Sequence, residues 1–378
     1  MLRKLPRIST MTARRTILVS VFVGACAATL HAQCGYGTAV RLSVPAGSLS
    51  VAAGDLNGDG KLDLVITGAF PFAIFFGDGK GSFTAGPTFI IPSATAAIAD
   101  VNGDGKADLV VSTLDGNIAV MLGHGDGTFA GPVGYPVGGS AVAMAVADFN
   151  GDGKPDVAVA NLENNVSVVL GKGDGTFGSP ITLAMPNGAY SLAAADFNRD
   201  GKLDLAVVSR TSSDIAILFG KGDGSFSVAP PARANYGAFS VIAADFNGDG
   251  IPDLATADSC CASASVLLGA GGGMFAPPVD LVLGSGGAFG IVAADFNGDG
   301  KLDLALADRS DRILVIPGNG DGTFGAETAY PAGTTPVGIA VGDFNGDGRI
   351  DAVAVDQESN DATLMLSQCH PRTRAVRH

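Results

Sequence analysis

Short apolar runs alternate with glycine- and aspartate-rich turns along most of the chain. In one unit, residues 143–147, 156–160 and 166–170 are apolar, the glycine turn 171–175 follows, and a further run begins at Phe177. Runs of this length bounded by Gly, Asp and Pro predict strands rather than helices. The Gly-Asp-Gly turn supplies the positive-φ positions of a tight hairpin. Each unit therefore predicts four antiparallel strands, which we call A to D in chain order.

The loop between strands A and B carries the motif D-x-N-x-D-x-x-x-D and occurs seven times, with a spacing of 45–50 residues. This period is the length of a four-stranded propeller blade. The seventh unit ends after its C strand at residues 362–366, whereas residues 37–44 resemble a D strand. The prediction is an all-β, seven-bladed β-propeller with four antiparallel strands per blade. It forms a single domain over residues 33–370, and the N-terminal strand closes the ring by pairing with the C-terminal blade.

The seven loops, together with the glycine turns and the Phe that follows them, resemble the FG-GAP or VCBS repeat family. The best-known relatives are the integrin-alpha-like propellers, the β-propeller heads of integrin α subunits. The resemblance covers the whole repeat region and implies a seven-bladed propeller with calcium in the A–B loops. It implies no single activity, because the family includes adhesion modules, lectins and accessory domains of enzymes.

The loop motif offers oxygen ligands at the spacing that calcium requires, since this cation takes six to eight oxygens. Side chains at positions one, three and five, a carbonyl at position seven and an Asp at position nine would surround one ion. We therefore expect about seven calcium ions, largely structural. The expected ligands, loop by loop, are Asp55, Asn57, Asp59, Lys61, Asp63; Asp100, Asn102, Asp104, Lys106, Asp108; Asp148, Asn150, Asp152, Lys154, Asp156; Asp196, Asn198, Asp200, Lys202, Asp204; Asp245, Asn247, Asp249, Ile251, Asp253; Asp295, Asn297, Asp299, Lys301, Asp303; and Asp343, Asn345, Asp347, Arg349, Asp351.

The loops have two competing interpretations. An EF-hand needs flanking helices and a bidentate Glu at position twelve, but position twelve here falls in strand B. The loops could instead be Asx-rich turns without metal. However, each loop concentrates three carboxylates, and the loops together hold more than half of the 37 acidic residues. Such crowding is unfavourable without a cation. The net charge of −14 disfavours a nucleic-acid ligand.

Residues 1–32 differ from the repeats in having a basic start, an apolar run over residues 17–30 and small residues near Ala32. This pattern predicts a signal peptide, cleaved after Ala32 or Gln33, and the run is too short to span a bilayer. Two alternatives are a lipobox that anchors Cys26 and a twin-arginine signal at Arg14 and Arg15. We expect a secreted, periplasmic or cell-envelope protein without a transmembrane span, and a basic C-terminal tail over residues 371–378.

Four of the 5 cysteines remain after cleavage at the predicted site. Cys34 precedes the N-terminal D strand and Cys369 follows the last C strand, so pairing of these strands predicts a disulfide between them. The alternative is that both termini fray and the thiols stay free. Cys260 and Cys261 are adjacent in the B–C turn of blade five. A vicinal disulfide, two free thiols or an intermolecular link are the options there.

Catalysis has little support in the sequence, since the 4 His form no triad and there is no P-loop, dinucleotide or zinc motif. We expect a monomeric binding or adhesion module for an extracellular or envelope glycan or protein ligand. The alternative is a calcium-dependent polysaccharide lyase or another carbohydrate-active propeller enzyme. The A–B loops and C–D turns should share one face, and the more variable B–C and D–A connections the other. On that second face, candidate ligand-binding residues are Tyr190, Arg210, Phe239 and Arg309.

Overall fold

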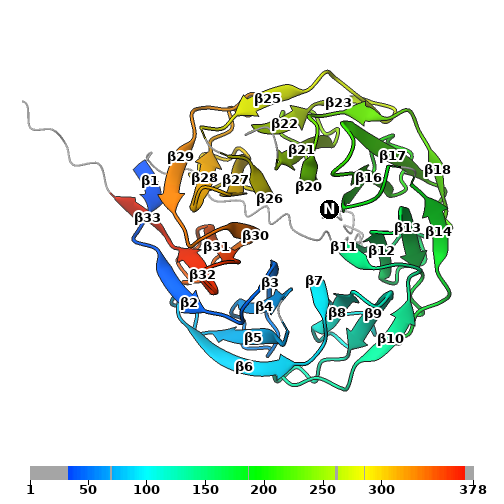
Figure 1. The fold of residues 1–378 in the computed structure, drawn as a ribbon, viewed down its shortest axis with the longest axis horizontal. Helices are drawn as coiled ribbons and strands as arrows, with labels where there is room; N and C mark the ends of the chain where they lie inside the picture. Colours follow the sequence, from blue (N-terminus) through cyan, green and yellow to red (C-terminus); the bar gives the residue numbers. More distant parts are fainter. Residues whose placement is uncertain (1–32, 69, 186, 260–262, 285, 371–378) are drawn as a thin grey trace, which may run out of the picture.

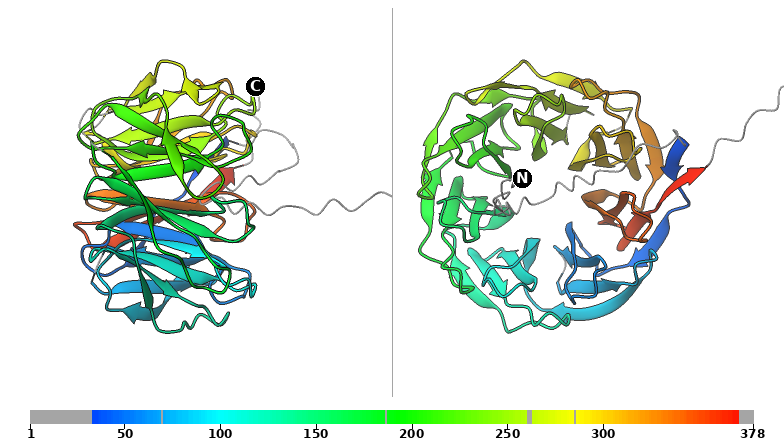
Figure 2. Two further views of the ribbon diagram at one scale, coloured as in Figure 1. Left: turned by 90° about the vertical axis from the view of Figure 1, so that its right-hand side faces the viewer. Right: turned by 180° about the vertical axis from the view of Figure 1, so that it is seen from behind.

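The apolar runs form strands because most of them are packed between two neighbouring sheets. The computed structural model describes residues 33–68, 70–185, 187–259, 263–284 and 286–370. Seven antiparallel sheets stand radially around a central axis, with the A strand of each sheet innermost (Figure 1). Figure 2 shows the same ring from the edge and from behind. The prediction of an all-β, seven-bladed propeller is confirmed.

The first four blades follow one another along the chain. Blade 1 contains β3 (Ser50–Gly54), β4 (Asp63–Thr67), β5 (Phe72–Gly77) and β6 (Phe83–Phe89). Blade 2 contains β7 (Ser93–Ala99), β8 (Asp108–Thr113), β9 (Asn117–Met121) and β10 (Val133–Pro136). Blade 3 contains β11 (Ala141–Ala147), β12 (Asp156–Asn161), β13 (Asn165–Val169) and β14 (Ile181–Ala184). Blade 4 contains β15 (Ser191–Ala195), β16 (Asp204–Val208), β17 (Asp214–Gly220), β18 (Phe226–Val228) and β19 (Ala232–Arg233).

The last three blades complete the ring. Blade 5 contains β20 (Ala238–Ala244), β21 (Asp253–Asp258), β22 (Ser263–Leu267) and β25 (Val279–Val282), with the small hairpin β23 (Gly269–Gly271) and β24 (Met274–Phe275). Blade 6 contains β26 (Ala288–Ala294), β27 (Asp303–Asp308), β28 (Arg312–Ile316) and β29 (Thr328–Pro331). Blade 7 contains β30 (Pro336–Gly342), β31 (Asp351–Asp356), β32 (Asp361–Met365) and β2 (Val40–Ser43).

The ring closes between the two ends of the chain, as predicted. β2 pairs antiparallel with β32, with Val40 opposite Leu364, so the N-terminal segment supplies the D strand of blade 7. The pairing continues in β1 (Gln33–Tyr36) and β33 (Ser367–His370). These blue and red segments lie side by side in Figure 1.

The burial of each strand follows its radial position. All six residues of β12 are buried, whereas β10 is mostly exposed at the outer edge. The core lies between the blades: Val110 and Val120 of blade 2 pack in one cluster with Val157 and Val159 of blade 3. The described ranges contain no helix that could cross a membrane.

One strand boundary differs from the expectation. The fourth strand of blade 3 begins at Ile181 rather than at Phe177. Phe177 instead forms an isolated bridge with Gly171, and the N–H of Gly178 donates to the carbonyl of Leu170 at 2.8 Å. The glycine turn thus extends through Phe177, because these contacts close the hairpin before regular pairing resumes.

Candidate functional site

In each of the seven A–B loops, the backbone wraps around the first Asp side chain. In the first loop, Oδ1 of Asp55 accepts hydrogen bonds from the N–H groups of Gly58 at 2.8 Å and Asp59 at 3.2 Å, and Oδ2 accepts one from Gly60 at 2.8 Å. Gly58 and Gly60 have φ of 75° and 80°, the left-handed region that favours glycine. The fourth loop adopts the same curvature with a non-glycine residue, since Arg199 has φ of 64°.

The remaining loop side chains form a series of Asx turns. Oδ1 of Asn57 accepts from the N–H of Asp59 at 2.9 Å, and Oδ1 of Asp59 accepts from Lys61 at 3.0 Å. The Nζ of Lys61 lies 2.9 Å from Oδ2 of Asp59, which offsets part of the negative charge. The loop thus keeps three oxygen-bearing side chains on one short turn, and Asp59 is exposed to solvent.

The Asp at position nine is buried and anchors the loop to the sheet. Oδ2 of Asp63 accepts from the N–H of Leu56 and Oδ1 from the N–H of Gly77, both at 2.9 Å. Burial raises the pKa of Asp63, and raises that of Asp156 to about 6. The equivalent residues with the same paired contacts are Asp108, Asp156, Asp204, Asp253, Asp303 and Asp351. Sequence reasoning gave this position only a metal-binding role, but it also joins strand A to strand C.

The predicted calcium sites remain predictions. Carboxylate, carboxamide and carbonyl oxygens are the donors that Ca²⁺ prefers. The first four expected ligand positions lie on one loop, and the fifth is the first residue of strand B. Within the described ranges, no three His, Cys, Asp or Glu side chains are arranged as a metal centre. The donor chemistry therefore fits calcium, while the Asx turns also account for the shape of the loop through its own hydrogen bonds.

The A–B loops and the C–D turns share one face, as expected from strand alternation. The N–H of Gly81, in a C–D turn of blade 1, donates to the carbonyl of Phe344 in the A–B loop of blade 7 at 2.9 Å. The N–H of Gly273 of blade 5 donates in the same way to Phe197 of blade 4 at 3.0 Å. We call this side the loop face. Contacts of this kind link blades 1, 3, 5 and 6 to the preceding blade.

On the opposite face, the structure brings the four predicted ligand-binding residues into one group, joined by Phe289, where the innermost strands of blades 4 to 6 begin. The rings of Tyr190 and Phe239 have centroids 4.6 Å apart, and the ring of Phe289 is 4.7 Å from that of Phe239. The guanidinium of Arg210 lies 5.0 Å from the Tyr190 centroid, and that of Arg309 lies 5.1 Å from the Phe289 centroid. These five residues form what we call the aromatic arc, across blades 4, 5 and 6.

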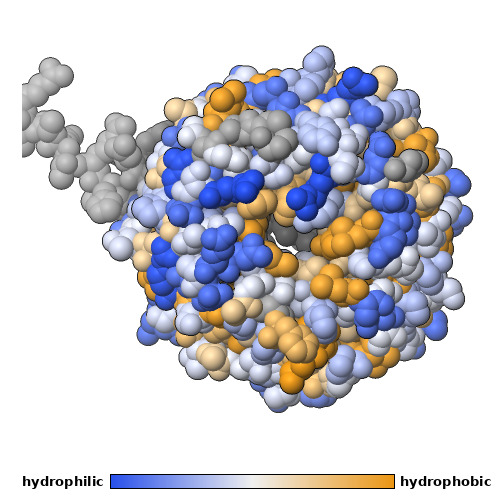
Figure 3. Space-filling model, viewed as in Figure 1, coloured by the Kyte–Doolittle hydropathy of each residue, from blue (hydrophilic) through white to orange (hydrophobic). Residues whose placement is uncertain are grey.

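Phe289 was missed in the sequence. The sequence feature that could have identified it is its position, six residues before the first Asp of its loop. Tyr190 and Phe239 occupy the same position in their own repeats. Figure 3 looks onto this face, where apolar and strongly hydrophilic side chains lie beside one another around the central opening.

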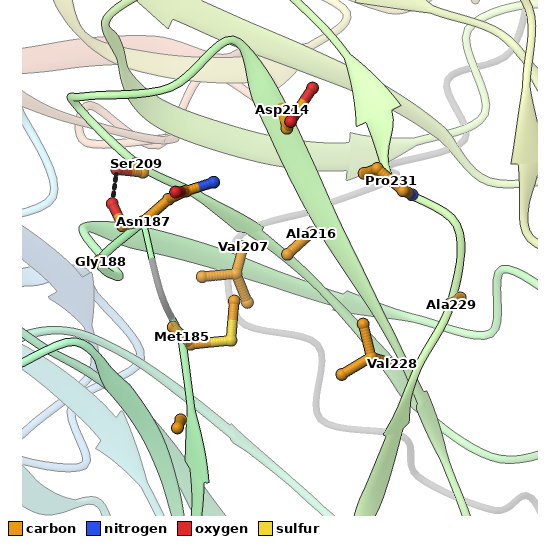
Figure 4. A pocket seen from close by; sticks show the side chains of 11 residues that line it. Met185, Asn187, Gly188, Val207, Ser209, Asp214, Ala216, Val228, Ala229 and Pro231 are labelled. Carbon is orange, nitrogen blue, oxygen red and sulfur yellow. Dashed lines mark hydrogen bonds between the residues drawn. The ribbon is translucent and has the colours of Figure 1, made fainter.

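A separate cavity of about 170 Å³ lies between the end of blade 3 and the sheet of blade 4. It is lined by Met185, Val207 and Val228, with Asp214 and Ser209 at its polar side (Figure 4). The hydroxyl of Ser209 hydrogen-bonds to the carbonyl of Asn187. The fourth strand of blade 4 is split into β18 and β19 around Pro230 and Pro231, which leaves this space at the rim.

Several polar groups on the second face support the ring closure. Nη1 of Arg41, on β2, lies 2.8 Å from Oδ2 of Asp361, and its Nη2 donates to the carbonyl of Ala332 at 2.6 Å. The nearby Asp356 is fully buried and accepts from Oγ1 of Thr363 at 2.6 Å. Burial raises the pKa of Asp356 to about 7. A carboxyl group titrating near neutral pH can indicate catalysis, but this one lies inside the sheet.

The Cys34–Cys369 disulfide stays a prediction, and the structure describes only the backbone around it. The two residues are directly opposite in the β1–β33 register. Since the N–H of Gly37 donates to the carbonyl of Leu366, alternation along the ladder makes the cysteines a non-hydrogen-bonded pair. Such pairs have Cα atoms about 4.5 Å apart, within the range for disulfides. Residues 1–32 with Cys26, the pair Cys260 and Cys261, and the tail 371–378 lie outside the described residues.

Comparisons with known proteins agree with this architecture. Six overlapping matches to the FG-GAP-like repeat cover residues 55–111, 100–159, 148–207, 203–256, 253–306 and 295–354. No curated protein shows significant sequence similarity to the chain.

Similar solved structures include two lectins. A lectin named BP39L from Burkholderia pseudomallei has a TM-score of 0.66 and 18% identity, over 85% of this chain and 96% of that chain. A lectin from Agrocybe aegerita, described as recognising non-reducing terminal N-acetylglucosamine, has a TM-score of 0.55 and 17% identity over the same shares. The protein BBS1N, solved in complex with ARL6DN, has a TM-score of 0.62 and 12% identity, over 90% of this chain and 100% of that chain. At these identities the similarity establishes the fold alone.

Proposed function

Because this chain belongs to the FG-GAP-like repeat family, we propose that it is an exported, calcium-binding propeller that binds or adheres to a glycan or protein ligand. The observation that carries this proposal is the difference between its two faces. The loop face repeats the same oxygen-rich turn seven times, whereas the opposite face gathers different side chains in each blade. Variable connections on a rigid scaffold are where recognition usually resides.

In this proposal the ions would be held by the loop side chains at positions one, three and five and the carbonyl at position seven, with the buried Asp at position nine behind them. Calcium would neutralise the carboxylates and fix the loops that link neighbouring blades. A site with a Kd of about 10⁻⁴ M in millimolar calcium would contribute roughly 1.4 kcal/mol to the free energy of unfolding. Seven such sites would make the fold depend on calcium.

Thermal unfolding in millimolar calcium and in excess EGTA tests this part of the proposal. We expect EGTA to lower Tm by about 10 °C or more, and added calcium to restore it. Magnesium is the control, since it needs near-ideal octahedral geometry and retains its water. An unchanged Tm in EGTA would show that the loops are self-sufficient Asx turns.

We propose a glycan as the ligand, with a protein as the alternative. The similarity of the fold to two lectins supports this preference. A glycan array probed with calcium-loaded protein tests the glycan assignment. Binding to a defined set of glycans supports it. Failure to bind any glycan, together with capture of one protein from envelope extracts, would favour the protein ligand.

We propose a binding role rather than an enzymatic one. Within the described residues, the carboxyl groups whose pKa is raised towards neutral pH are buried, and they accept hydrogen bonds that hold the sheets together. A polysaccharide lyase would instead need such a group at an accessible cleft. Incubation of the protein with acidic polysaccharides, followed by absorbance of unsaturated products, is the direct assay, and we expect no product.

Export is proposed from the sequence of residues 1–32, and the monomeric state from the closed ring. Mass determination of the protein recovered from the producing cells tests the cleavage after Ala32 or Gln33. A mass that includes a lipid on Cys26 would replace the soluble form by an anchored one.

A further inference from the structure

The aromatic arc departs from the sevenfold repeat in three adjacent blades. The position six residues before the first Asp of each loop is equivalent in all seven units. Its occupants, from blade 1 to blade 7, are Leu49, Ala94, Val142, Tyr190, Phe239, Phe289 and Val337. Aromatic rings therefore occur at this position only in blades 4 to 6, and there they contact one another edge to face. The frame of the propeller does not require them, because four other blades use aliphatic residues.

The two arginines of the arc also occupy one equivalent position, fourteen residues after the first Asp, in blades 4 and 6. Both are exposed, and the ion pairs found among the described residues involve neither of them. By contrast, Arg41, Arg233 and Arg312 all pair with carboxylates. The aromatic arc thus carries two cations without acidic partners in a chain with net charge −14.

We propose that the aromatic arc is the ligand-binding site, and that its ligand is an acidic polysaccharide bearing carboxylate or sulfate groups. This inference rests on the proposed binding function and specifies its ligand. The C–H faces of sugar rings would pack on the half-buried rings of Tyr190, Phe239 and Phe289. Arg210 and Arg309 would each bind an anionic group in bidentate geometry, for which guanidinium is suited.

The dimensions of the arc favour a polysaccharide over a small anion. The rings of Tyr190, Phe239 and Phe289 follow one another at centroid distances of 4.6 and 4.7 Å, similar to the spacing of successive rings in an extended sugar chain. The guanidinium of Arg210 lies over Tyr190 and also 5.3 Å from the centroid of Phe239, whereas that of Arg309 lies over Phe289. A sugar chain that lies along the three rings would bring anionic groups on successive sugars to both guanidinium groups.

Isothermal titration of the calcium-loaded protein with three oligosaccharides tests the ligand class. The probes are hyaluronan, which carries carboxylate alone, chondroitin sulfate, which adds sulfate, and neutral chitin oligosaccharide. We expect at least one acidic probe to bind about tenfold or more tightly than the neutral one, with an affinity that falls as salt is raised. A polyglutamate peptide is the fourth probe, and equally tight binding of this peptide would overturn the polysaccharide assignment.

Charge-removing variants locate the site. Arg210→Gln and Arg309→Gln should each weaken binding of the acidic probe about tenfold, as loss of a charge-assisted hydrogen bond predicts. Phe239→Leu should weaken it as well, while its Tm reports whether the fold is intact. The matched control is Arg233→Gln, an exposed arginine at the outer edge of blade 4, which should leave affinity unchanged.

The outcomes separate this inference from the proposed function. Binding of the neutral probe alone, or acidic binding that both arginine variants retain, would overturn the arc as the site while the binding function stands. Absence of binding to any glycan probe or array position would overturn both the arc and the glycan function.

Discussion

At position nine of each A–B loop, a buried Asp accepts hydrogen bonds from two backbone N–H groups. By contrast, the residue fourteen positions after the first Asp of the loop varies among the blades. Both positions flank strand B, at its two ends. The first is uniform because its carboxylate completes a backbone hydrogen-bond pattern that every blade shares. The second is free to vary because the contact that recurs at this turn uses the backbone N–H, as at Leu162 and Arg309, and not the side chain.

The comparison shows how a repeated fold can carry a single specific site. The loop face meets the same geometric demand seven times, so its residues are repeated. The fold requires no particular side chains on the face with the aromatic arc. A departure from the repeat on this face therefore reflects a requirement other than folding.

The largest effect is expected at a buried anchor of the loop face. Asp156→Ala removes the acceptor of the N–H groups of Phe149 and Gly171 and leaves both buried donors unsatisfied. We expect a loss of about 3–5 kcal/mol in the free energy of unfolding, with or without calcium. Urea unfolding measures it. Asp152→Ala, in the same loop but exposed, is the control, and should lower stability mainly in calcium.

If Asp156→Ala and Asp152→Ala had equal effects in EGTA, the anchoring role of position nine would be wrong. If neither variant responded to calcium, the loop would not be a metal site.

The closure of the ring should show the next largest effect. Cys34→Ser removes the proposed disulfide with Cys369, and the loss should be about 2–4 kcal/mol under oxidising conditions. Cys369→Ser should give the same loss, and the double variant no more. Peptide mapping without reduction checks the linkage. Detection of Cys34 joined to Cys260 or Cys261 would contradict both the bridge and the closure.

A pH-dependent effect is expected on the second face, at the end of strand B of blade 5. Asp258 is buried, and burial raises its pKa to about 6 although the hydroxyls of Thr256, Ser263 and Ser265 donate to it. A raised pKa means that the folded state binds the proton more tightly than the unfolded state. Stability from this group is therefore present below about pH 4 and is lost as the pH rises to about 6.

Asp258→Asn should remove this dependence. Between about pH 4 and pH 6, wild type should lose about 2–3 kcal/mol of stability relative to the variant, measured by urea unfolding at fixed calcium. Parallel pH curves for the two proteins would refute the assignment.

The smallest effect is expected at Arg41. Its guanidinium is partly exposed and links the N-terminal strand to Asp361 and to the carbonyl of Ala332. Arg41→Gln should therefore cost about 1 kcal/mol, with a weaker salt dependence than wild type. A loss comparable to that of Asp156→Ala would show that closure depends on this ion pair rather than on strand pairing.

Most of the fold was predictable because its determinants are local or periodic. The loop motif fixes the number of blades, and the missing D strand after residue 366 points to the N-terminal segment that replaces it. What the sequence could not show depends on contacts between repeats. The contact between Phe239 and Phe289, with ring centroids 4.7 Å apart, depends on how the propeller places the side chains of adjacent blades. The role of Asp63 as a backbone hydrogen-bond acceptor could not be predicted, because an Asp at this position is equally compatible with a metal-ligand motif.

Hydrogen exchange followed by mass spectrometry tests the central distinction between the faces most directly. Calcium should slow exchange in the A–B loops, whose amides at Gly58, Asp59 and Gly60 bind Asp55. The acidic oligosaccharide should slow it around Tyr190, Phe239 and Phe289 and leave the loops unchanged. Two footprints on opposite faces are the predicted result. An oligosaccharide footprint on the A–B loops would contradict the account, because the repeated face would then be the binding face.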